Sequence, residues 1–323
     1  MSSSIVALAG GVGGSKLAFG LYRALAPNEL SVIVNTGDDF DLYSLRISPD
    51  ADTVLYTLAE LANPETGWGI AGDTFETLAA LRRYGEDTWF QLGDRDFATH
   101  LMRTERLRSG ARLTEVLAAF TTALQVRAQI LPMSDDPVAT IIRTGSGELD
   151  FQEYFVRRHH ADDVVGVRFA GIESATISTE VGRAIASADA IIFCPSNPIV
   201  SIGPILAVPE MREILHAAEA PIVAVSPIVA GQALRGPADR MLLGLGYEPS
   251  PVAIAEIYRD LIDGLVIDRQ DSAATERIRA LSLEVLVTDT IMTDASDRER
   301  LAGEVLRFAA GLRAERGHAA DRG

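Results

Sequence analysis

The feature that most constrains the fold of this chain is a glycine cluster between an apolar run and a helical pattern near its start. The run Ile5–Ala9 has the composition of a buried strand, and residues 16–25 carry leucines at helical spacing. A second apolar run, Leu30–Val34, follows. A strand, a tight turn, a helix and another strand make a βαβ unit, which places its two strands parallel and is typical of nucleotide-binding folds.

Later apolar runs repeat this pattern and are separated mostly by segments of helical character. They lie at residues 165–169, 190–194, 221–225, 264–267 and 283–287. Residues 52–125 contain no comparable strand, but helices are predicted over 73–84 and 94–108, with Gly85 and Gly110 as C-terminal stops. Residues 138–142 and 151–156 flank a Thr-Gly-Ser-Gly turn at 144–147, which is a hairpin signal.

These patterns predict an α/β fold: a Rossmann-like, mostly parallel sheet with a helical insertion and a small antiparallel β element. We expect a core domain formed by residues 1–60 and 160–312. We expect an inserted helical and β-hairpin subdomain at 61–159. Residues 313–323 mix charge, Gly and Ala and are predicted to be a flexible tail.

Composition limits the partners of the chain. A net charge of −16 in 323 residues argues against nucleic acid or an anionic membrane as a partner, because both would be repelled. The N-terminus lacks the features of a signal peptide, and no apolar run approaches the ~20 residues that span a bilayer. We therefore expect a cytoplasmic protein. The single cysteine, Cys194, ends an apolar run and is predicted to be a buried strand thiol rather than a nucleophile.

Four acidic residues follow the second predicted strand: Asp38, Asp39, Asp50 and Asp52. In an open parallel sheet, ligands bind beyond the carboxyl ends of the strands, so acids concentrated there favour a metal or a polar substrate. Carboxylate oxygens are the ligands that Mg²⁺ prefers. The alternative is helix capping, with Asp50 or Asp52 capping the helix that begins near residue 53. Capping accounts for one of the four acids, and the group as a whole indicates an Mg²⁺ site.

The glycine cluster at 10–16 follows a strand and opens a helix, where backbone N–H groups hold a phosphate or another anion. Its spacing matches neither a P-loop nor the dinucleotide fingerprint. The alternative is a set of tight turns needed only for packing.

Further loops carry candidate binding residues. The segment 67–75, with Trp68, suits a shaped binding loop. Arg95 lies in the first turn of a predicted helix, where the helix dipole disfavours a cation. It is predicted to face an anion, or to pair with Asp94 or Asp96.

Polar residues also follow two later strands. Ser196 and Asn197 belong to a proline-stiffened loop at 195–204, and Ser226 and then Arg235 follow the next strand. A diphosphate or nucleotide could bind at that edge. The five histidines show no metal-ligand spacing, and no nucleophile motif is present.

Seven segments in order resemble the 2-phospho-L-lactate transferase family, called CofD in archaea and FbiA in actinobacteria. They are residues 10–16, 34–39, 47–53, 67–69, 92–100, 195–198 and 226–231. The resemblance runs from residue 1 to about residue 295. In one departure, the chain has Ile70 and Ala71 where family members often carry a basic residue.

The resemblance implies an Mg²⁺-dependent transfer, in coenzyme F420 biosynthesis, of a phosphorylated three-carbon acid from its guanosine-diphosphate adduct to the deazaflavin Fo. GMP would be released, and a homodimer is expected. Asp38 and Asp50 are implied to be catalytic and to hold Mg²⁺ or the Fo hydroxyls. The substrate-binding residues implied with them are Gly11, Gly13, Gly14, Lys16, Asn35, Thr36, Asp39, Asp52, Trp68, Arg95, Ser196, Asn197 and Ser226.

Two other functions are open. A nucleotide-sugar-binding regulator of the gluconeogenesis-factor type shares the glycine turn and the Asp-Asp pair, but the segments at 67–69 and 92–100 favour the transferase. A nicotinamide dehydrogenase is disfavoured, because no acidic residue ends the second strand in the ribose-binding manner.

Overall fold

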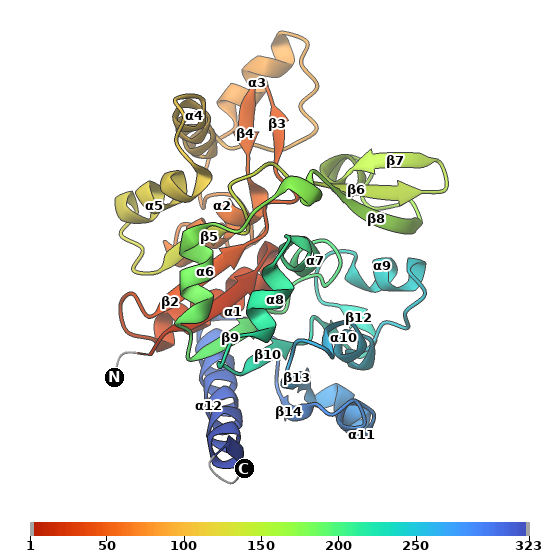
Figure 1. Ribbon diagram of the computed structural model, residues 1–323. Helices are drawn as coiled ribbons and strands as arrows, with labels where there is room; N and C mark the ends of the chain where they lie inside the picture. Colours follow the sequence, from red (N-terminus) through yellow and green to blue (C-terminus); the bar gives the residue numbers. More distant parts are fainter. Residues whose placement is uncertain (1–2, 321–323) are drawn as a thin grey trace.

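The computed structural model describes residues 3–320 and has a seven-stranded, wholly parallel sheet at its centre (Figure 1). Its strands, in spatial order, are β14 (Glu284–Thr288), β13 (Gly264–Asp268), β10 (Ile222–Val225), β9 (Ala190–Phe193), β1 (Ile5–Ala9), β2 (Leu30–Val34) and β5 (Gln129–Pro132). The Rossmann-like parallel sheet is confirmed. Strand β1 is paired with β2 on one side and β9 on the other, so the strand order reverses at β1.

Helices cover both faces of this sheet. On one face pack α1 (Gly11–Ala24), α2 (Pro49–Leu58), α5 (Leu113–Ala123) and α12 (Ala295–Ala320). On the other lie α6 (Thr179–Ala186), α7 (Ile202–Ala207), α8 (Met211–His216), α10 (Pro251–Tyr258) and α11 (Thr275–Arg279). Side chains alternate between the two cores along each strand: Val6 and Leu8 belong to one core, and Ala7 to the other. Both faces are therefore buried, as parallel sheets require.

A three-stranded antiparallel sheet projects from this core, with order β7 (Gly147–Asp150), β6 (Ala139–Thr144) and β8 (Val164–Ala170). The predicted hairpin turn joins β6 to β7, which confirms the small antiparallel element. Strand β8 corrects the prediction for 165–169, since it pairs with β6 rather than with the large sheet. Val165 is 58% exposed, so one side of β8 faces solvent, which only an antiparallel sheet allows. Residues 151–156 are also not a strand, because a π-helical segment occupies Glu153–Arg157.

The region between β2 and β5 is helical, as predicted. It contains α3 (Glu76–Arg83) and α4 (Asp94–Arg108), besides α2, α5 and the short hairpin of β3 (Phe40–Leu42) and β4 (Leu45–Ile47). Gly85 and Gly110 follow α3 and α4 with φ of +91° and +92°, which confirms them as helix stops. The remaining elements are η2 (Ile172–Ser174), β11 (Ile228–Val229), β12 (Gln232–Ala233), α9 (Ala238–Gly244) and η3 (Arg269–Ala274).

Two segments differ from expectation. Strand β5 lies within 61–159, the range expected to be an insertion, yet it forms the edge of the large sheet beside β2. It is short and contains Pro132, which an edge strand tolerates and which weakens its sequence signal. Helix α12 continues through 313–320, where a flexible tail was expected, and Arg313 and Arg316 bond to Asp189 and Asp263. Residues 321–323 lie outside the described part, and the division into core and insertion stays a prediction.

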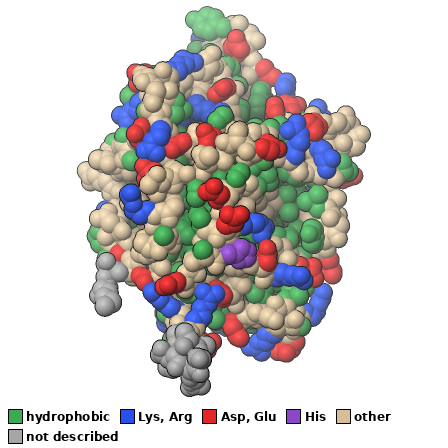
Figure 2. Space-filling model, in the orientation of Figure 1, with side chains coloured by type: hydrophobic (Ala, Val, Ile, Leu, Met, Phe, Trp, Pro, Cys, Tyr) green, Lys and Arg blue, Asp and Glu red, His purple; other side chains and the backbone are tan. Residues whose placement is uncertain are grey.

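Within residues 3–320, no helix combines the length and apolar content needed to cross a bilayer. On the face of the molecule drawn in Figure 2, Lys and Arg side chains are interspersed with Asp and Glu rather than gathered in one field. Cys194 follows β9 and is buried, as predicted, and burial raises the pKa of its thiol.

Candidate active site

A cavity of about 1140 Å³ opens beyond the carboxyl ends of the central strands. Its wall includes the glycine turn after β1, the first turn of α2 and the loop after β9. This is the point where the strand order reverses, which is where open parallel sheets bind ligands. Further parts of the wall come from residues 66–69, residues 89–92, the start of α4, the segment 151–159, and the loops at 226–238 and 290–293.

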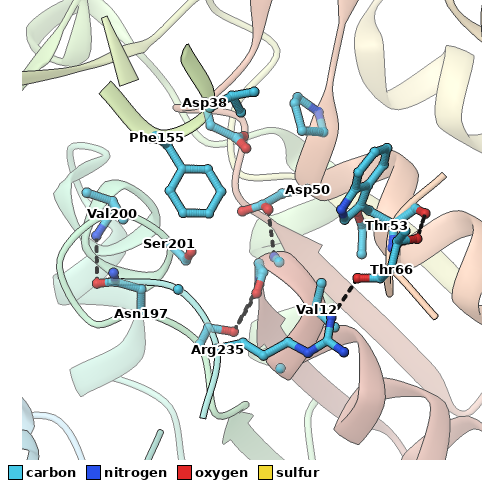
Figure 3. A pocket seen from close by; sticks show the side chains of 18 of the residues that line it. Val12, Asp38, Asp50, Thr53, Thr66, Phe155, Asn197, Val200, Ser201 and Arg235 are labelled. Carbon is cyan, nitrogen blue, oxygen red and sulfur yellow. Dashed lines mark hydrogen bonds between the residues drawn. The ribbon is translucent and has the colours of Figure 1, made fainter. Parts of the chain in front are cut away.

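Asp38 and Asp50 both line this cavity (Figure 3), and the side-chain amide of Asn35 links them. The Asn35 side-chain nitrogen donates to Asp50 Oδ2 at 2.9 Å and lies 3.4 Å from Asp38 Oδ1. Asp50 Oδ1 also accepts the backbone N–H of Gly11 at 2.6 Å. Asn35 is itself held by the Val200 carbonyl at 3.2 Å. Asp50 thus contacts the glycine turn directly, and Asn35, which follows β2, connects Asp50 to Asp38.

The negative charge of this pair is not neutralised by the protein. Burial raises the pKa of Asp38 well above its usual range, and the charges of Asp50 and Asp39 raise it further. Burial also raises the pKa of Asp50 to about 6, although its hydrogen bonds from Asn35 and Gly11 oppose the shift. Among the described side chains, neither carboxylate forms an ion pair with Lys, Arg or His. The site is therefore prepared for a cation or for hydrogen-bond donors from a ligand.

The other two acids of the sequence cluster face protein cations instead. Asp39 Oδ2 accepts a hydrogen bond from the Ser48 hydroxyl at 2.7 Å and lies 3.6 Å from Arg46 Nε. Asp52 accepts two hydrogen bonds from the fully buried guanidinium of Arg103. Asp39 does not line the cavity, whereas Asp52 does. Asp52 is thus compensated by a guanidinium, whereas burial raises the pKa of Asp39 to about 7 although Arg46 and Ser48 oppose the shift.

Asp52 also belongs to a second group, with Asp96 and His100 of α4, whose ligand atoms all lie within 4.8 Å of one another. This buried group could hold a metal ion. Tyr56 donates to Asp96 at 2.7 Å, and His100 Nε2 lies 3.2 Å from the same carboxylate oxygen. Burial opposes ionisation of Asp96, but the hydrogen bond and charge of His100 lower its pKa overall.

Arg103 already occupies part of this second group. Its Nη1 lies 3.0 Å from Asp52 Oδ2 and 3.2 Å from His100 Nδ1. The sequence analysis assigned no chemistry to histidine and missed His100. The spacing of Asp96 and His100, four residues apart on one helix face, is the signal that indicates it.

The glycine turn approaches the β9 loop closely. A Cβ atom on Gly13 would lie 2.4 Å from the Pro195 carbonyl oxygen, so only glycine fits there. The Gly10 N–H donates to Ser196 Oγ at 3.1 Å, and the Gly11 N–H is used by Asp50. Val12 and Gly13 line the cavity, and their N–H groups, in the first helical turn, have no intrahelical acceptor.

The remaining predicted site residues separate into those that line the cavity and those that do not. Besides the residues already described, the cavity is lined by Gly11, Lys16, Trp68, Ser196, Asn197 and Ser226. Gly14, Asn35, Thr36 and Arg95 do not line it. Gly14 is buried against Ser196, and Asn35 acts through the carboxylates that it holds. The Thr36 hydroxyl is buried without a hydrogen-bond partner among the described residues.

Arg95 contacts neither of the acids that the sequence analysis considered. Its backbone N–H donates to the Asp73 carboxylate at 2.9 Å, and its Nη1 donates to the Ala71 carbonyl at 3.3 Å. Asp73 thus caps α4 from outside, a long-range contact that the sequence does not reveal.

The sequence analysis also missed an aromatic part of the cavity wall. Trp89, Phe90, Phe151 and Phe155 line it, and the last two rings are stacked with centroids 5.4 Å apart. Gln152, between them in sequence, places its side-chain nitrogen 3.3 Å from the Asp38 carbonyl oxygen. No motif marks these residues, because they come from a loop and a short helical segment that only the tertiary fold brings to the carboxyl end of β1.

Comparisons with known proteins agree with this geometry. A model of the family described as 2-phospho-L-lactate transferase CofD matches residues 5–306. A phosphoenolpyruvate transferase of Kitasatospora aureofaciens is 44% identical over 316 residues, which cover 96% of this chain and 98% of the relative. A 2-phospho-L-lactate transferase of Methanocaldococcus jannaschii is 40% identical over 312 residues, with 95% and 99% covered.

A solved structure of a UPF0052-family protein from Bacillus halodurans superposes with a TM-score of 0.62 at 14% identity, covering 95% of this chain and 99% of the other. At that identity the likeness shows the fold alone. The family match extends over nearly the whole chain and includes the glycine turn, the acid pair and α4. The chain therefore belongs to the 2-phospho-L-lactate transferase family.

Proposed function

We propose that this enzyme transfers a phosphorylated three-carbon acid, 2-phospho-L-lactate or phosphoenolpyruvate, from its guanosine-diphosphate adduct to Fo in coenzyme F420 biosynthesis. The ribityl hydroxyl of Fo attacks the phosphorus that carries the acid, the bond from that phosphorus to the bridging oxygen breaks, and GMP leaves with that oxygen. The observation that carries the proposal, together with family membership, is the uncompensated Asp38 and Asp50 pair beside the glycine turn. Phosphoryl transfer needs positioning and charge neutralisation more than covalent catalysis.

Mg²⁺ fits the pair better than it fits the second acid group. Asp38 and Asp50 present oxygen ligands and have no cationic partner among the described side chains, so a divalent cation would stabilise their charged forms. The group of Asp52, Asp96 and His100 contains a nitrogen ligand and is already neutralised by Arg103. We assign Mg²⁺ to Asp38 and Asp50. When bound, the ion would neutralise charge on the phosphates and orient them.

Other groups of the protein bind the diphosphate and the deazaflavin ring. The free N–H groups of the glycine turn and the Lys16 ammonium bind the diphosphate. The aromatic wall, with Phe155 and Trp68, encloses the flat deazaflavin ring. One of Asp38 and Asp50 also accepts the proton of the attacking hydroxyl, since both carboxylates line the cavity.

The test is direct. Purified protein is incubated with Fo, Mg²⁺ and, separately, the guanosine-diphosphate adducts of lactate, enolpyruvate and glycerate, and phosphorylated deazaflavin is followed by mass spectrometry. Product from one adduct establishes the transfer and identifies the acid. No product from any adduct, with thermal stabilisation by a UDP-sugar and none by Fo, would replace this proposal with the nucleotide-sugar-binding regulator. The homodimer and the cytoplasmic location remain predictions.

A further inference from the structure

Lys16 is unusual in this chain, because it is the single lysine: the other 28 of the 29 basic residues are arginines. It lies in the first turns of α1, lines the cavity, and donates from Nζ to the Met292 carbonyl at 2.8 Å. Burial lowers the pKa of Lys16, and the neighbouring charges of Arg298 and Arg235 lower it further. Lys16, Arg235 and Arg298 are therefore close enough for their charges to interact, and we call them the cationic group.

These cations have no acidic partner, although the chain carries 45 acidic residues. Among the described side chains, no ion pair joins a carboxylate to Lys16, Arg235 or Arg298, whereas 14 arginines form one. The charge of Asp294 favours the protonated form of Arg298, but the two side chains form no ion pair, and the Asp294 carbonyl accepts the backbone N–H of Arg298 at 3.3 Å. Mutual repulsion among unpaired cations is unfavourable, and a bound anion would reverse it.

Arg235 connects this cationic group to the loop that carries Trp68. Its Nη1 donates to the Thr66 carbonyl at 2.6 Å, across the mouth of the cavity (Figure 3). Thr66 in turn donates from its hydroxyl to the Trp68 carbonyl at 2.6 Å. Gly67 permits this contact: a Cβ atom there would lie 2.6 Å from Val12 and 3.1 Å from Arg235 Nη1.

Most of the hydrogen-bonding capacity of Arg235 remains unused. A guanidinium has five N–H donors, and within the described residues only the bond to Thr66 is found. The side chain lines the cavity beside Val12, whose N–H group is also free. A planar fork of donors with no carboxylate partner matches the two oxygens of a phosphate.

Resting on the proposed function, we propose that Lys16 and Arg235, backed by Arg298, clamp the diphosphate of the guanosine-diphosphate donor. Arg235 also transmits donor binding through Thr66 to Trp68, so that the donor orders the wall against which Fo packs. Lys16 and Arg235 are thus positioning residues for the donor, and Arg235 couples the two substrates.

The clamp is tested by calorimetric titration of the full chain with GDP and Mg²⁺. Arg235→Gln and Lys16→Gln should each weaken GDP binding about 10- to 100-fold, since each removes a charge-assisted hydrogen bond. Arg235→Lys should fall in between, because it keeps the charge without the fork. The matched control is Arg240→Gln, an exposed arginine that donates to the carbonyls of His160 and Ala161 and should leave GDP binding unchanged. GDP binding by both Gln variants within about twofold of wild type would overturn the clamp.

The coupling between donor binding and Trp68 is tested separately, by tryptophan fluorescence. Trp68 and Trp89 are the two tryptophans, so Trp89→Phe leaves Trp68 as the only indole. GDP should change Trp68 emission in that background, and Arg235→Gln should abolish the change even at saturating GDP. An unaltered change would contradict the coupling.

Failure of the clamp and failure of the proposed function are distinguishable. Transfer to Fo by the wild type, with normal GDP binding by the variants, rejects only the clamp. The expected loss of GDP binding without transfer by the wild type rejects only the proposed reaction. Thermal melts confirm folding, and Arg235→Lys replaces Arg235→Gln if the latter does not fold.

Discussion

Asp50 and Asp52 lie in the same first turn of α2, and both are buried, yet their surroundings differ completely. Asp52 faces α4 and is neutralised by Arg103, while Asp50 faces the cavity with only neutral donors, Asn35 and the Gly11 N–H. Residues two apart on a helix point in different directions. One helical turn therefore presents Asp52 to a buried arginine of α4 and Asp50, without a charged partner, to the cavity.

The comparison teaches that burial alone does not identify a catalytic carboxylate. Burial raises the pKa of both residues, but only Asp52 has a guanidinium that opposes the rise. An acid whose charge the protein leaves unpaired is available to a metal or a substrate. An acid with a buried arginine partner contributes to stability, because removal of either partner exposes an uncompensated charge to a low dielectric.

The largest effect should come from Asp50→Asn. Because the carboxylate contacts both the glycine turn and Asn35, we expect turnover to fall by about 10³-fold, within the range for losing a positioned catalytic group. The control is Asp41→Asn, whose side chain is 73% exposed and should leave turnover unchanged. Near-normal turnover of Asp50→Asn at limiting Mg²⁺ would remove Asp50 from the catalytic site.

Asp50→Asn should lower turnover, whereas Arg103→Met should lower the stability of the fold. Removing one partner of a buried ion pair costs about 3–5 kcal/mol, measured as the free energy of unfolding in urea. The matched control is Arg106→Met. The guanidinium carbon of Arg106 lies 5.7 Å from the centroid of the Phe120 ring, and that of Arg103 lies 5.9 Å from the same centroid. Among the described side chains, however, Arg106 forms no ion pair with an acid. Asp52→Asn in the Arg103→Met background should recover part of the loss. Equal stability of the two single variants would refute the structural role of the pair.

Mg²⁺ can be located by its stabilising effect. An ion at 100 times its dissociation constant stabilises the fold by about 2.7 kcal/mol, which thermal melting detects. We expect this gain in the wild type and in Asp96→Asn, and its loss in Asp38→Asn. The reverse pattern, with the gain lost in Asp96→Asn, would place the ion in the second group beside His100.

The features that could be predicted from the sequence are those that depend on local periodicity and on the residues at strand ends. The parallel sheet, α4, its glycine stop and the placement of the acids at the end of β2 all follow from patterns within about 20 residues. The acid group was predicted as one site because the strand end was clear. The sequence did not show which of these acids has a cationic partner, because Arg103, the partner of Asp52, is 51 residues away in the chain.

The errors have the same origin. Strand β8 has the composition of a buried strand, but its pairing with β6 decides which sheet it joins. The aromatic wall at Phe151 and Phe155 belongs to a segment that was predicted to be a strand and is helical. Arg235 was expected at the diphosphate edge, but its bond to Thr66, which spans 169 positions, was not predicted. Tertiary contacts of this length leave no local signal.

The smallest expected effect is a gain of stability in Asp38→Asn without Mg²⁺. The pKa of Asp38 is raised in the folded protein, by burial and then by Asp50 and Asp39, above the ~3.9 of an unfolded chain. The protonated form thus favours folding, and the wild type loses this contribution as the pH rises through the folded pKa. Asparagine stays neutral, so the melting temperature of Asp38→Asn should exceed that of wild type at pH 8, by about 2–4 °C for each kcal/mol. The difference should shrink toward pH 4, and a variant less stable than wild type at pH 8 would show that the carboxylate of Asp38 is compensated after all.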